Sequence, residues 1–342
     1  MDHRVLLCFV LGLGLLFSTL STLAGAQGVG VNYGMLGNNL PTPDKVVGLY
    51  ASRGITKLRL FSPDAAVLAA LRGSGISVVL GTLNEDLQRL AADQSFAANW
   101  VQTNVAPFAT TGVAFRYINA GNEVIPGADA TQVLPAMQNL DAALRAANLS
   151  VPVTTAVSTE VLGTSYPPSQ GTFSQSAAPV LTPIVAFLQA KGTPLLVNVY
   201  PYFAYAGSPN DVPLNYALFT SPSVVVQDGS LGYTNLFDAI VDSVYAALEK
   251  AGGPQVAVVV SETGWPSGGG GVGATVDNAR LYNNNVVAHV ESSAGTPRRP
   301  GKGIETYLFA MFNEDEKPAG TEQNFGLYRP DMSEVYHVNF AS

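Results

Sequence analysis

Residues 235–262 read NLFDAIVDSVYAALEKAGGPQVAVVVSE, and two different periodicities meet within them. The first half carries one apolar stripe at helical spacing, made of Leu236, Phe237, Ile240, Val241, Val244, Tyr245 and Leu248. Gly252 and Gly253 end this helix, and the run 256–260 that follows is continuously apolar. Such a run is typical of a parallel strand buried on both faces. The segment is therefore a helix followed by a strand of an α/β protein.

The same alternation of a short apolar run and a longer helical pattern occurs eight times along the chain. The strands are predicted at residues 28–33, 57–61, 77–81, 115–120, 153–157, 195–200, 256–260 and 304–310. Helices are predicted between them, for example from Pro43 to near Gly54 and over residues 130–147. No linker interrupts the alternation, so we predict one α/β domain, a closed (β/α)8 TIM barrel, rather than a doubly wound sheet.

The first residues of the chain have the pattern of a secretory signal. Arg4 is followed by an apolar run over 5–17, and Ala24-Gly25-Ala26 matches a signal-peptidase site. The run is shorter than the roughly 20 residues of a membrane span, so we expect cleavage rather than an anchor. We predict a signal peptide over 1–26 and the barrel domain over 27–342. Cys8, the single cysteine, would leave with the signal.

The composition of the chain excludes several kinds of partner. A net charge of -8 disfavours nucleic acid, which is bound through clustered Lys and Arg. Only 12% of the residues are charged, which suits a neutral, hydroxyl-rich ligand. The histidines, His3, His289 and His337, have no metal-ligand spacing, so we predict no metal and no cofactor.

Two glutamates follow predicted strands at positions where a barrel carries its chemistry. Glu123 ends the sequence Asn119-Ala120-Gly121-Asn122-Glu123 after strand four, and Glu262 follows strand seven. In a barrel both would lie on the rim at the carboxyl ends of the strands. Two carboxylates on one rim are the minimum for glycoside hydrolysis, one protonated and one ionised.

Five motifs extend this observation to most of the chain. They are Gly30-Val31-Asn32-Tyr33-Gly34, residues 119–123, Val199-Tyr200-Pro201-Tyr202-Phe203, Val260-Ser261-Glu262-Thr263-Gly264-Trp265-Pro266, and Glu305-Thr306-Tyr307 through Phe312-Asn313-Glu314. In this order they resemble glycoside hydrolase family 17, the plant endo-1,3-β-glucanases, in the clan of retaining barrel enzymes. The resemblance implies that Glu123 is the acid/base and Glu262 the nucleophile. It also implies that Asn122 binds the sugar 2-hydroxyl.

Further residues are candidates for supporting roles. Tyr200, at the end of strand six, is placed to hydrogen-bond an ionised Glu262. Glu305 and Glu314 are expected near Glu262, either as carboxylates that bind sugar hydroxyls or set the local field, or as members of a structural ion pair with Lys317. Aromatic residues near the rim are candidates for stacking on glucose rings, namely Tyr33, Phe203, Trp265, Phe312 and Phe325.

Two short motifs complete the pattern. The glycine run 268–271 lacks the ending of a phosphate-binding loop and is interpreted as a flexible loop beside the cleft. Asn148-Leu149-Ser150 is an N-glycosylation sequon after a helix.

These features predict a secreted, monomeric glycoside hydrolase of the extracellular space or cell wall. Its leading substrate is 1,3-β-glucan, with wall remodelling and plant defence as open roles. Three alternatives remain open from the sequence: hydrolysis of mixed-linkage 1,3-1,4-β-glucan by the same residues, net transglycosylation, and a catalytically silent glucan-binding wall protein.

Overall fold

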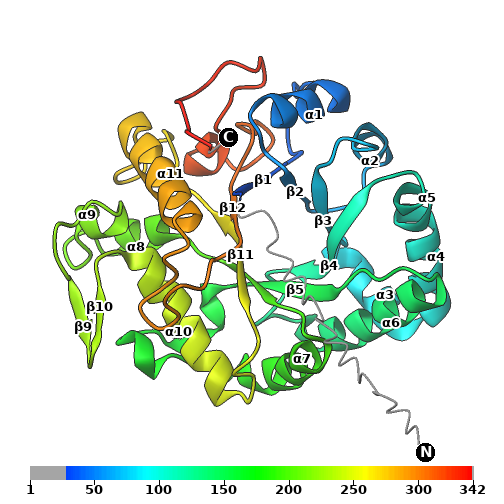
Figure 1. The fold of residues 1–342 in the computed structure, drawn as a ribbon, viewed down its shortest axis with the longest axis horizontal. Helices are drawn as coiled ribbons and strands as arrows, with labels where there is room; N and C mark the ends of the chain where they lie inside the picture. Colours follow the sequence, from blue (N-terminus) through cyan, green and yellow to red (C-terminus); the bar gives the residue numbers. More distant parts are fainter. Residues whose placement is uncertain (1–27, 341–342) are drawn as a thin grey trace, which may run out of the picture.

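The computed structural model describes residues 28–340 and confirms the closed barrel. Eight parallel strands form a ring in the order β1-β12-β11-β8-β5-β4-β3-β2, with helices around the outside (Figure 1). The strands are β1 (Gly30–Asn32), β2 (Lys57–Leu60), β3 (Ser77–Gly81), β4 (Ala114–Asn122), β5 (Val153–Ser158), β8 (Leu195–Asn198), β11 (Val258–Thr263) and β12 (Thr306–Leu308). The signal peptide expected over 1–26 lies outside the described residues.

Each connection between barrel strands contains at least one helix until β12 is reached. The longer helices are α1 (Pro43–Ser52), α4 (Gln94–Asn104), α6 (Val133–Ala146), α7 (Ala178–Lys191), α10 (Leu236–Lys250) and α11 (Val276–Glu291). Shorter helices are α2 (Ala65–Ala70), α3 (Leu87–Ala92), α5 (Ala106–Ala109), α8 (Pro201–Gly207) and α9 (Leu214–Ala217). Two small hairpins, β6 (Leu162–Thr164) with β7 (Thr172–Phe173) and β9 (Val226–Asp228) with β10 (Leu231–Tyr233), lie outside the ring.

The unit formed by α10 and β11 shows how the local sequence produces this architecture. Asn235 caps α10, because its side-chain oxygen accepts a hydrogen bond of 2.8 Å from the backbone N–H of Asp238. Most of the apolar stripe of the helix is buried against the barrel wall, and Leu236 and Ile240 at its edge are half-buried. Strand β11 extends further than predicted, to Thr263, so Glu262 lies within the strand. A register shift between Val260 and Glu262 in the pairing with β8 accompanies this extension.

The inside of the barrel is filled in layers. A middle layer of side chains packs at its centre and consists of Val79, Ala156, Leu196, Val259 and Tyr307, with Tyr117 against it. Above this layer, toward the carboxyl ends of the strands, the buried side chains Asn32, Arg59 and Asn198 are polar. A packed apolar layer under polar groups is the arrangement that gives a barrel a rigid floor for its site.

The eighth helix of the predicted alternation is absent from the described residues. Residues 309–340 instead form an irregular segment containing one short 3-10 helix, η5 (Thr321–Asn324). Bridges from Phe312 to Tyr328 and from Tyr328 to Glu334 hold this segment together. Pro318 and Pro330 in this stretch cannot donate backbone hydrogen bonds, which explains why a regular helix does not form there.

Glu305 lies at the opposite end of the barrel from the rim, so its predicted place beside Glu262 is wrong. It precedes β12, and its carboxylate forms a bidentate ion pair with Arg116 at the start of β4. The hydroxyl of Tyr307 donates to the same carboxylate at 2.8 Å. Because all eight strands run in one direction, a residue before a strand lies at the amino end. The prediction placed Glu305 in strand eight, and this position alone does not show at which end of the barrel the side chain lies.

The position of Glu305 predicts an effect on stability without an effect on chemistry. Glu305→Gln leaves Arg116 and the neighbouring Lys57 without a compensating negative charge, and we expect the free energy of unfolding to fall by about 2 kcal/mol. We expect kcat on the natural substrate to stay unchanged. Chemical denaturation and steady-state kinetics on the same preparation measure both.

Asp277→Asn provides the control, because Asp277 pairs with Arg280 at 3.6 Å on the solvent-exposed face of α11. This change should alter the free energy of unfolding by less than about 0.5 kcal/mol. A Glu305→Gln variant of normal stability but low kcat would show that Glu305 acts on the reaction.

Candidate active site

Glu123 follows directly on β4, at a point where the strand ladder becomes irregular. The pairing of β4 with β5 shifts register between Asn119 and Asn122, and Gly121 within the shift has a φ of 79°. Glu123 itself has a φ of 56°, in the left-handed region that non-glycine residues seldom adopt. Glu123 is exposed to solvent at the rim of the barrel. A strained backbone at a carboxylate on the rim is typical of a functional position.

Glu262 is buried and surrounded by hydrogen-bond donors. Only 6% of the residue is exposed. Its Oε1 accepts from Arg59 Nη1 at 2.6 Å and from Asn198 Nδ2 at 2.9 Å, and its Oε2 accepts from the Tyr200 hydroxyl at 2.8 Å. Donors to both oxygens favour the ionised carboxylate and fix its orientation. Burial and the negative charge of Glu262 raise the pKa of Tyr200 well above its usual value, so its phenol remains a donor.

The two carboxylates are held close together by one amide group. Asn198 Nδ2 donates to Glu123 Oε1 at 2.8 Å as well as to Glu262 Oε1 at 2.9 Å. The sum of these two lengths, 5.7 Å, is therefore an upper limit on the distance between the two Oε1 atoms. Retaining glycosidases hold their carboxyl groups about 5–5.5 Å apart, and inverting enzymes about 6.5–9.5 Å apart.

The electrostatic environment separates the two groups in their proton affinity. Loss of hydration at the rim raises the pKa of Glu123, and the charges of Glu262 and Glu160 raise it further. The hydrogen bond from Asn198 and the charge of Arg59 oppose this shift without reversing it. Glu123 thus has a raised pKa and keeps its proton to higher pH than an ordinary glutamate, as suits a general acid.

Two residues that bind the carboxylates, and a third that orients one of them, did not stand out in the sequence. Arg59 comes from the middle of the apolar run of β2, Asn198 ends β8, and Ser261 precedes Glu262. The Ser261 hydroxyl donates to Asn198 Oδ1 at 2.7 Å, which turns the amide nitrogen toward the two glutamates. The signal that could have found them is a polar residue inside an otherwise apolar parallel strand, where only a functional or paired group is tolerated.

The side-chain oxygen of Asn122 is hydrogen-bonded within the site, whereas its NH2 group is available to a ligand. Its Oδ1 accepts from Arg59 Nη2 at 2.8 Å and from Asn198 Nδ2 at 3.2 Å. These two donors identify the orientation of the amide, with its NH2 group directed away from Arg59 and Asn198. An NH2 group beside the two carboxylates can donate to a sugar hydroxyl.

Glu314 lies near the rim but is buried and bound to its own surroundings. Its Oε1 accepts from the backbone N–H of Leu36 at 2.9 Å, and Lys317 Nζ lies 3.9 Å from its Oε2. Burial raises the pKa of Glu314, while the charge of Lys317 acts in the opposite direction. Of the two interpretations left open by the sequence, the ion pair with Lys317 is the one that the contacts of Glu314 favour.

The aromatic residues expected to stack on sugar divide into two groups. Tyr33, Trp265, Phe312 and Phe325 are each at most 3% exposed, so the prediction that their ring faces are open to a ligand is wrong. Trp265 donates from its indole nitrogen to the carbonyl oxygen of Gly273 and packs on the ring of Tyr202. Phe203 is 47% exposed and packs on Tyr200, so it alone of the five presents a ring face beside the carboxylates.

The glycine run 268–271 packs against the segment that follows β12. A Cβ atom added at Gly269 would lie 2.3 Å from the backbone of Gly320, and one at Gly271 would lie 2.3 Å from the Tyr202 hydroxyl. Gly269 also has a φ of 90°. Close backbone approach therefore accounts for glycine here, rather than the flexibility that the sequence suggested.

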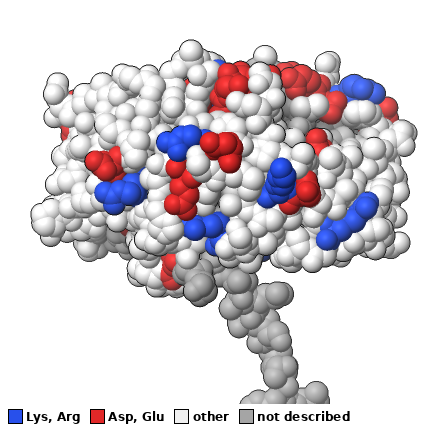
Figure 2. Space-filling view, turned by 90° about the horizontal axis from the view of Figure 1, so that it is seen from above, with Lys and Arg blue, Asp and Glu red and all other residues white. Residues whose placement is uncertain are grey.

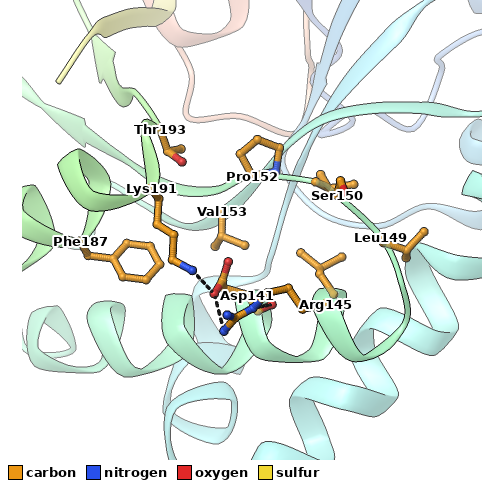
Figure 3. Close-up of a pocket in the computed structure, with 11 residues that line it drawn as sticks. Asp141, Arg145, Leu149, Ser150, Pro152, Val153, Phe187, Lys191 and Thr193 are labelled. Atoms are coloured by element: carbon orange, nitrogen blue, oxygen red, sulfur yellow. Dashed lines mark hydrogen bonds and ion pairs between the residues drawn. The ribbon is translucent and has the colours of Figure 1, made fainter. Parts of the chain in front are cut away.

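A separate cleft lies at the amino end of the barrel, remote from the carboxylates (Figure 3). Asp141 on α6 occupies its centre and pairs with Lys191 at 2.8 Å and with Arg145 at 2.9 Å. These mutual pairs leave no charged group of the cleft directed at a ligand. Among residues 28–340, no group of three or more His, Cys, Asp or Glu side chains could hold a metal ion.

The surface shown in Figure 2 carries few charged side chains, and positive and negative groups lie next to one another. Most of this face is uncharged, in agreement with the low proportion of charged residues in the chain. No continuous basic surface of the kind that binds phosphates is present on it.

Comparison with known proteins identifies relatives along nearly the whole chain. The sequence model of glycosyl hydrolases family 17 matches residues 29–340. The chain is 65% identical over 322 residues to a protein of Hordeum vulgare named "Putative glucan endo-1,3-beta-glucosidase GVI", covering 94% of this chain and 99% of the relative. It is 51% identical over 341 residues to a glucan endo-1,3-beta-glucosidase of Vitis vinifera, covering 97% and 98%.

Solved structures give the same result for the fold. A structure from a study of two plant β-glucan endohydrolases with distinct substrate specificities has a TM-score of 0.88 at 48% identity, over 91% of this chain and all of that one. A β-1,3-glucanase and allergen of Cryptomeria japonica pollen has a TM-score of 0.89 at 46% identity, over 92% and 99%.

The charge of Glu160 predicts a shift in the pH profile. Glu160→Gln removes one of the negative charges that raise the pKa of Glu123, so this pKa should fall. The protonated acid is then lost at lower pH, and the alkaline limb of kcat/KM should move toward lower pH. Because Glu160 is exposed, the shift should be largest at low salt.

Profiles of kcat/KM against pH at low and high ionic strength test this expectation. Asp277→Asn, which removes a surface charge on α11, should leave the alkaline limb in place. An alkaline limb that does not move in Glu160→Gln at low salt would contradict the assignment of this limb to Glu123.

Proposed function

Because this chain belongs to glycosyl hydrolases family 17, and is therefore a glycoside hydrolase, we propose that it cleaves internal 1,3-β-D-glucosidic linkages of 1,3-β-glucan with retention of configuration. The observation that carries the retaining mechanism is the limit of 5.7 Å between carboxylate oxygens of Glu123 and Glu262. A shared amide that holds one oxygen of each carboxylate this close fits the short carboxyl separation of a retaining enzyme. The names of the relatives support the linkage.

In the first step, Glu262 attacks the anomeric carbon while Glu123 protonates the departing oxygen. Glu123 Oε1 accepts from Asn198, so the acidic proton is carried on Oε2 and faces the glycosidic oxygen. The bond between the anomeric carbon and that oxygen breaks, and a bond between the carbon and a Glu262 oxygen forms. The shortened glucan leaves with a new hydroxyl group, and a glycosyl-Glu262 ester remains.

In the second step, Glu123 acts as a base. Its carboxylate removes a proton from a water molecule, whose oxygen attacks the anomeric carbon and displaces Glu262. Arg59 and Tyr200 each bind one oxygen of the departing carboxylate, and they stabilise the charge that returns to it. Two inversions at the same carbon give overall retention.

Asn122 and the exposed ring of Phe203 are proposed to bind the sugar. Arg59 and Asn198 occupy the amide oxygen of Asn122, and its NH2 group is left to donate to the 2-hydroxyl of the glucose that reacts. This hydrogen bond strengthens as positive charge develops on the ring in the transition state. Tyr33, Trp265, Phe312 and Glu314 are proposed to support the walls of the site rather than to touch the substrate, because each is buried.

Substitution of the nucleophile gives the primary test. Glu262→Gln should lower kcat on laminarin by on the order of 10⁴-fold or more, because the amide cannot form the glycosyl ester. A time course of oligosaccharides released from laminarin, and in parallel from mixed-linkage 1,3-1,4-β-glucan, identifies the substrate. Mixed oligosaccharides at early times would show endo-cleavage, and NMR of the first product would show its configuration.

Each other result assigns a different function. Preferential cleavage of the mixed-linkage polymer would keep the mechanism and replace the substrate, and products longer than the starting oligosaccharide would indicate transglycosylation. Binding to glucan without any release of products would identify a silent binding protein. A Glu262→Gln variant with near-normal kcat would exclude Glu262 as the nucleophile.

We further propose that the protein is exported and acts as a monomer in the extracellular space or the cell wall. The signal pattern over 1–26 supports export, and both carboxylates with all the groups that bind them come from one chain. Within residues 28–340, no helix is both long and apolar enough to cross a membrane. One relative, from Nicotiana tabacum, is named as a basic vacuolar isoform, so the vacuole is the competing destination. In the wall, callose and fungal glucan are both substrates of this chemistry, which fits remodelling as well as defence.

The sequon at Asn148 should carry a glycan on the exported protein. Asn148 is exposed in the turn after α6, where its φ is 57°, and Ser150 is also exposed. Peptide mass spectrometry of protein purified from the medium of expressing plant cells should find hexosamine-containing mass on Asn148. Treatment with an N-glycosidase should remove it, and Ser150→Ala should prevent its addition. Unmodified Asn148 on protein recovered from the medium would contradict this proposal.

A further inference from the structure

Asn84 is an exposed residue that clamps the backbone next to the proposed acid/base. It begins the 3-10 helix η1 (Asn84–Asp86) in the loop that follows β3. Its Oδ1 accepts from the backbone N–H of Asn122 at 2.8 Å, and its Nδ2 donates to the carbonyl oxygen of the same residue at 2.9 Å. One side-chain amide thus pairs with both polar groups of one backbone residue, as a neighbouring strand would.

This clamp replaces a strand ladder that has ended. The regular pairing of β3 with β4 stops at Gly81 and Asn119. Beyond it, the Thr82 hydroxyl accepts from the backbone N–H of Gly121, and Asn84 binds Asn122. The side chains of the loop therefore continue, at the edge of β4, the hydrogen bonding that the backbone of β3 no longer supplies.

The peptide unit between Asn122 and Glu123 is held from both sides. Its carbonyl oxygen accepts from Asn84, and its N–H donates to the carbonyl oxygen of Ala156 on β5 at 2.9 Å. The orientation of this unit sets the φ of Glu123, which is 56°. A left-handed conformation costs free energy for a residue with a Cβ atom, so it persists only where the surroundings enforce it. Asn84 supplies one of the two bonds that enforce it.

We propose that Asn84 is a positioning residue for Glu123, which holds the peptide before Glu123 in the orientation that directs its carboxyl group at the leaving oxygen. The proposal rests on the role of Glu123 given above. Without Asn84, the peptide can rotate about its remaining bond to Ala156 and Glu123 can relax toward a negative φ. The carboxyl group then leaves its bond to Asn198 and its place beside the glycosidic oxygen.

The nucleophile depends on this clamp less directly than Glu123 does. Glu262 is held by Arg59, Asn198 and Tyr200, and the only link from Asn84 to these residues runs through the Asn122 side chain, which accepts from Arg59 and Asn198. Loss of Asn84 should therefore impair proton donation much more than nucleophilic attack. Because Asn84 is exposed and belongs to a surface loop, its substitution should not prevent folding.

Leaving groups of different acidity separate these two functions. A departing sugar needs a proton from Glu123, whereas 2,4-dinitrophenolate leaves without one. In Asn84→Ala we expect kcat/KM on laminarin to fall by about ten- to a hundredfold, part of what a general acid contributes. On 2,4-dinitrophenyl β-laminaribioside we expect a change within about twofold, because kcat/KM there reports only attack by Glu262.

Two further variants sharpen the comparison. Asn84→Asp keeps the acceptor for the Asn122 N–H but loses the donor to its carbonyl oxygen, so it should show the same selective loss. Asn284→Ala is the matched control, because Asn284 clamps the C-terminal segment in the same way. It donates to the carbonyl oxygen of His337 and accepts from the N–H of Asn339, each at 2.9 Å. We expect unchanged kcat/KM on both substrates in this control.

The outcomes distinguish the inference from the proposed function. Wild-type protein that cleaves neither laminarin nor the activated glycoside would refute the proposed function itself. With active wild-type protein, equal losses on both substrates in Asn84→Ala, or no loss on either, would refute the positioning role. A raised KM with an unchanged ratio between the substrates would assign Asn84 to sugar binding instead. Circular dichroism and the melting temperature of each variant confirm that the folded protein is being compared.

Discussion

The ion pair between Arg59 and Glu262 is the interaction on which the site depends. The Arg59 side chain is fully buried, and its guanidinium lies 2.6 Å from the Glu262 carboxylate. Burial of two charges costs more than their attraction returns unless further hydrogen bonds satisfy them. Arg59 meets this condition at both terminal nitrogens, which also donate to Asn122 and to the carbonyl oxygen of Ser261, while its Nε has no hydrogen-bond partner among the described residues. The pair therefore links β2, β4 and β11, and it makes the carboxylate of the proposed nucleophile part of the packed interior of the barrel.

The opposite environment of Glu123 follows from the same construction. Glu262 accepts hydrogen bonds from the side chains of Arg59, Asn198 and Tyr200, whereas Glu123 shares only the amide of Asn198. Because the ionised Glu262 lies close by, a second negative charge at Glu123 is disfavoured, and the pKa of Glu123 is raised by lost hydration and by this charge. The pKa of Glu123 is thus raised although Arg59 opposes the shift, as suits the proton donor of the proposed double displacement.

The sequence predicts the fold well because its strands are local patterns. Eight apolar runs identified all eight barrel strands, and the position of Glu123 and Glu262 after strands four and seven placed them at one end. The contacts of Arg59, Asn198 and Asn84 could not be predicted, since they join residues far apart in the chain. The error at Glu305 has a related cause. A carboxylate before a strand and one after it look alike in sequence, but they lie at opposite ends of the barrel.

The two ends of the barrel also differ in how the backbone is held. At the amino end, the carboxylate of Glu305 binds both Arg116 and Tyr307 and so joins β4 to β12, which favours stability. At the carboxyl end the ladder between β3 and β4 stops before Glu123, and the hydroxyls of Thr82 and Thr155 bind the backbone of Gly121 and Ala120. A backbone ladder would impose extended conformations, whereas bonds from side chains permit the positive φ angles found there. The irregular end of β4 is therefore the condition under which a carboxylate can be turned out of the strand and into the cleft.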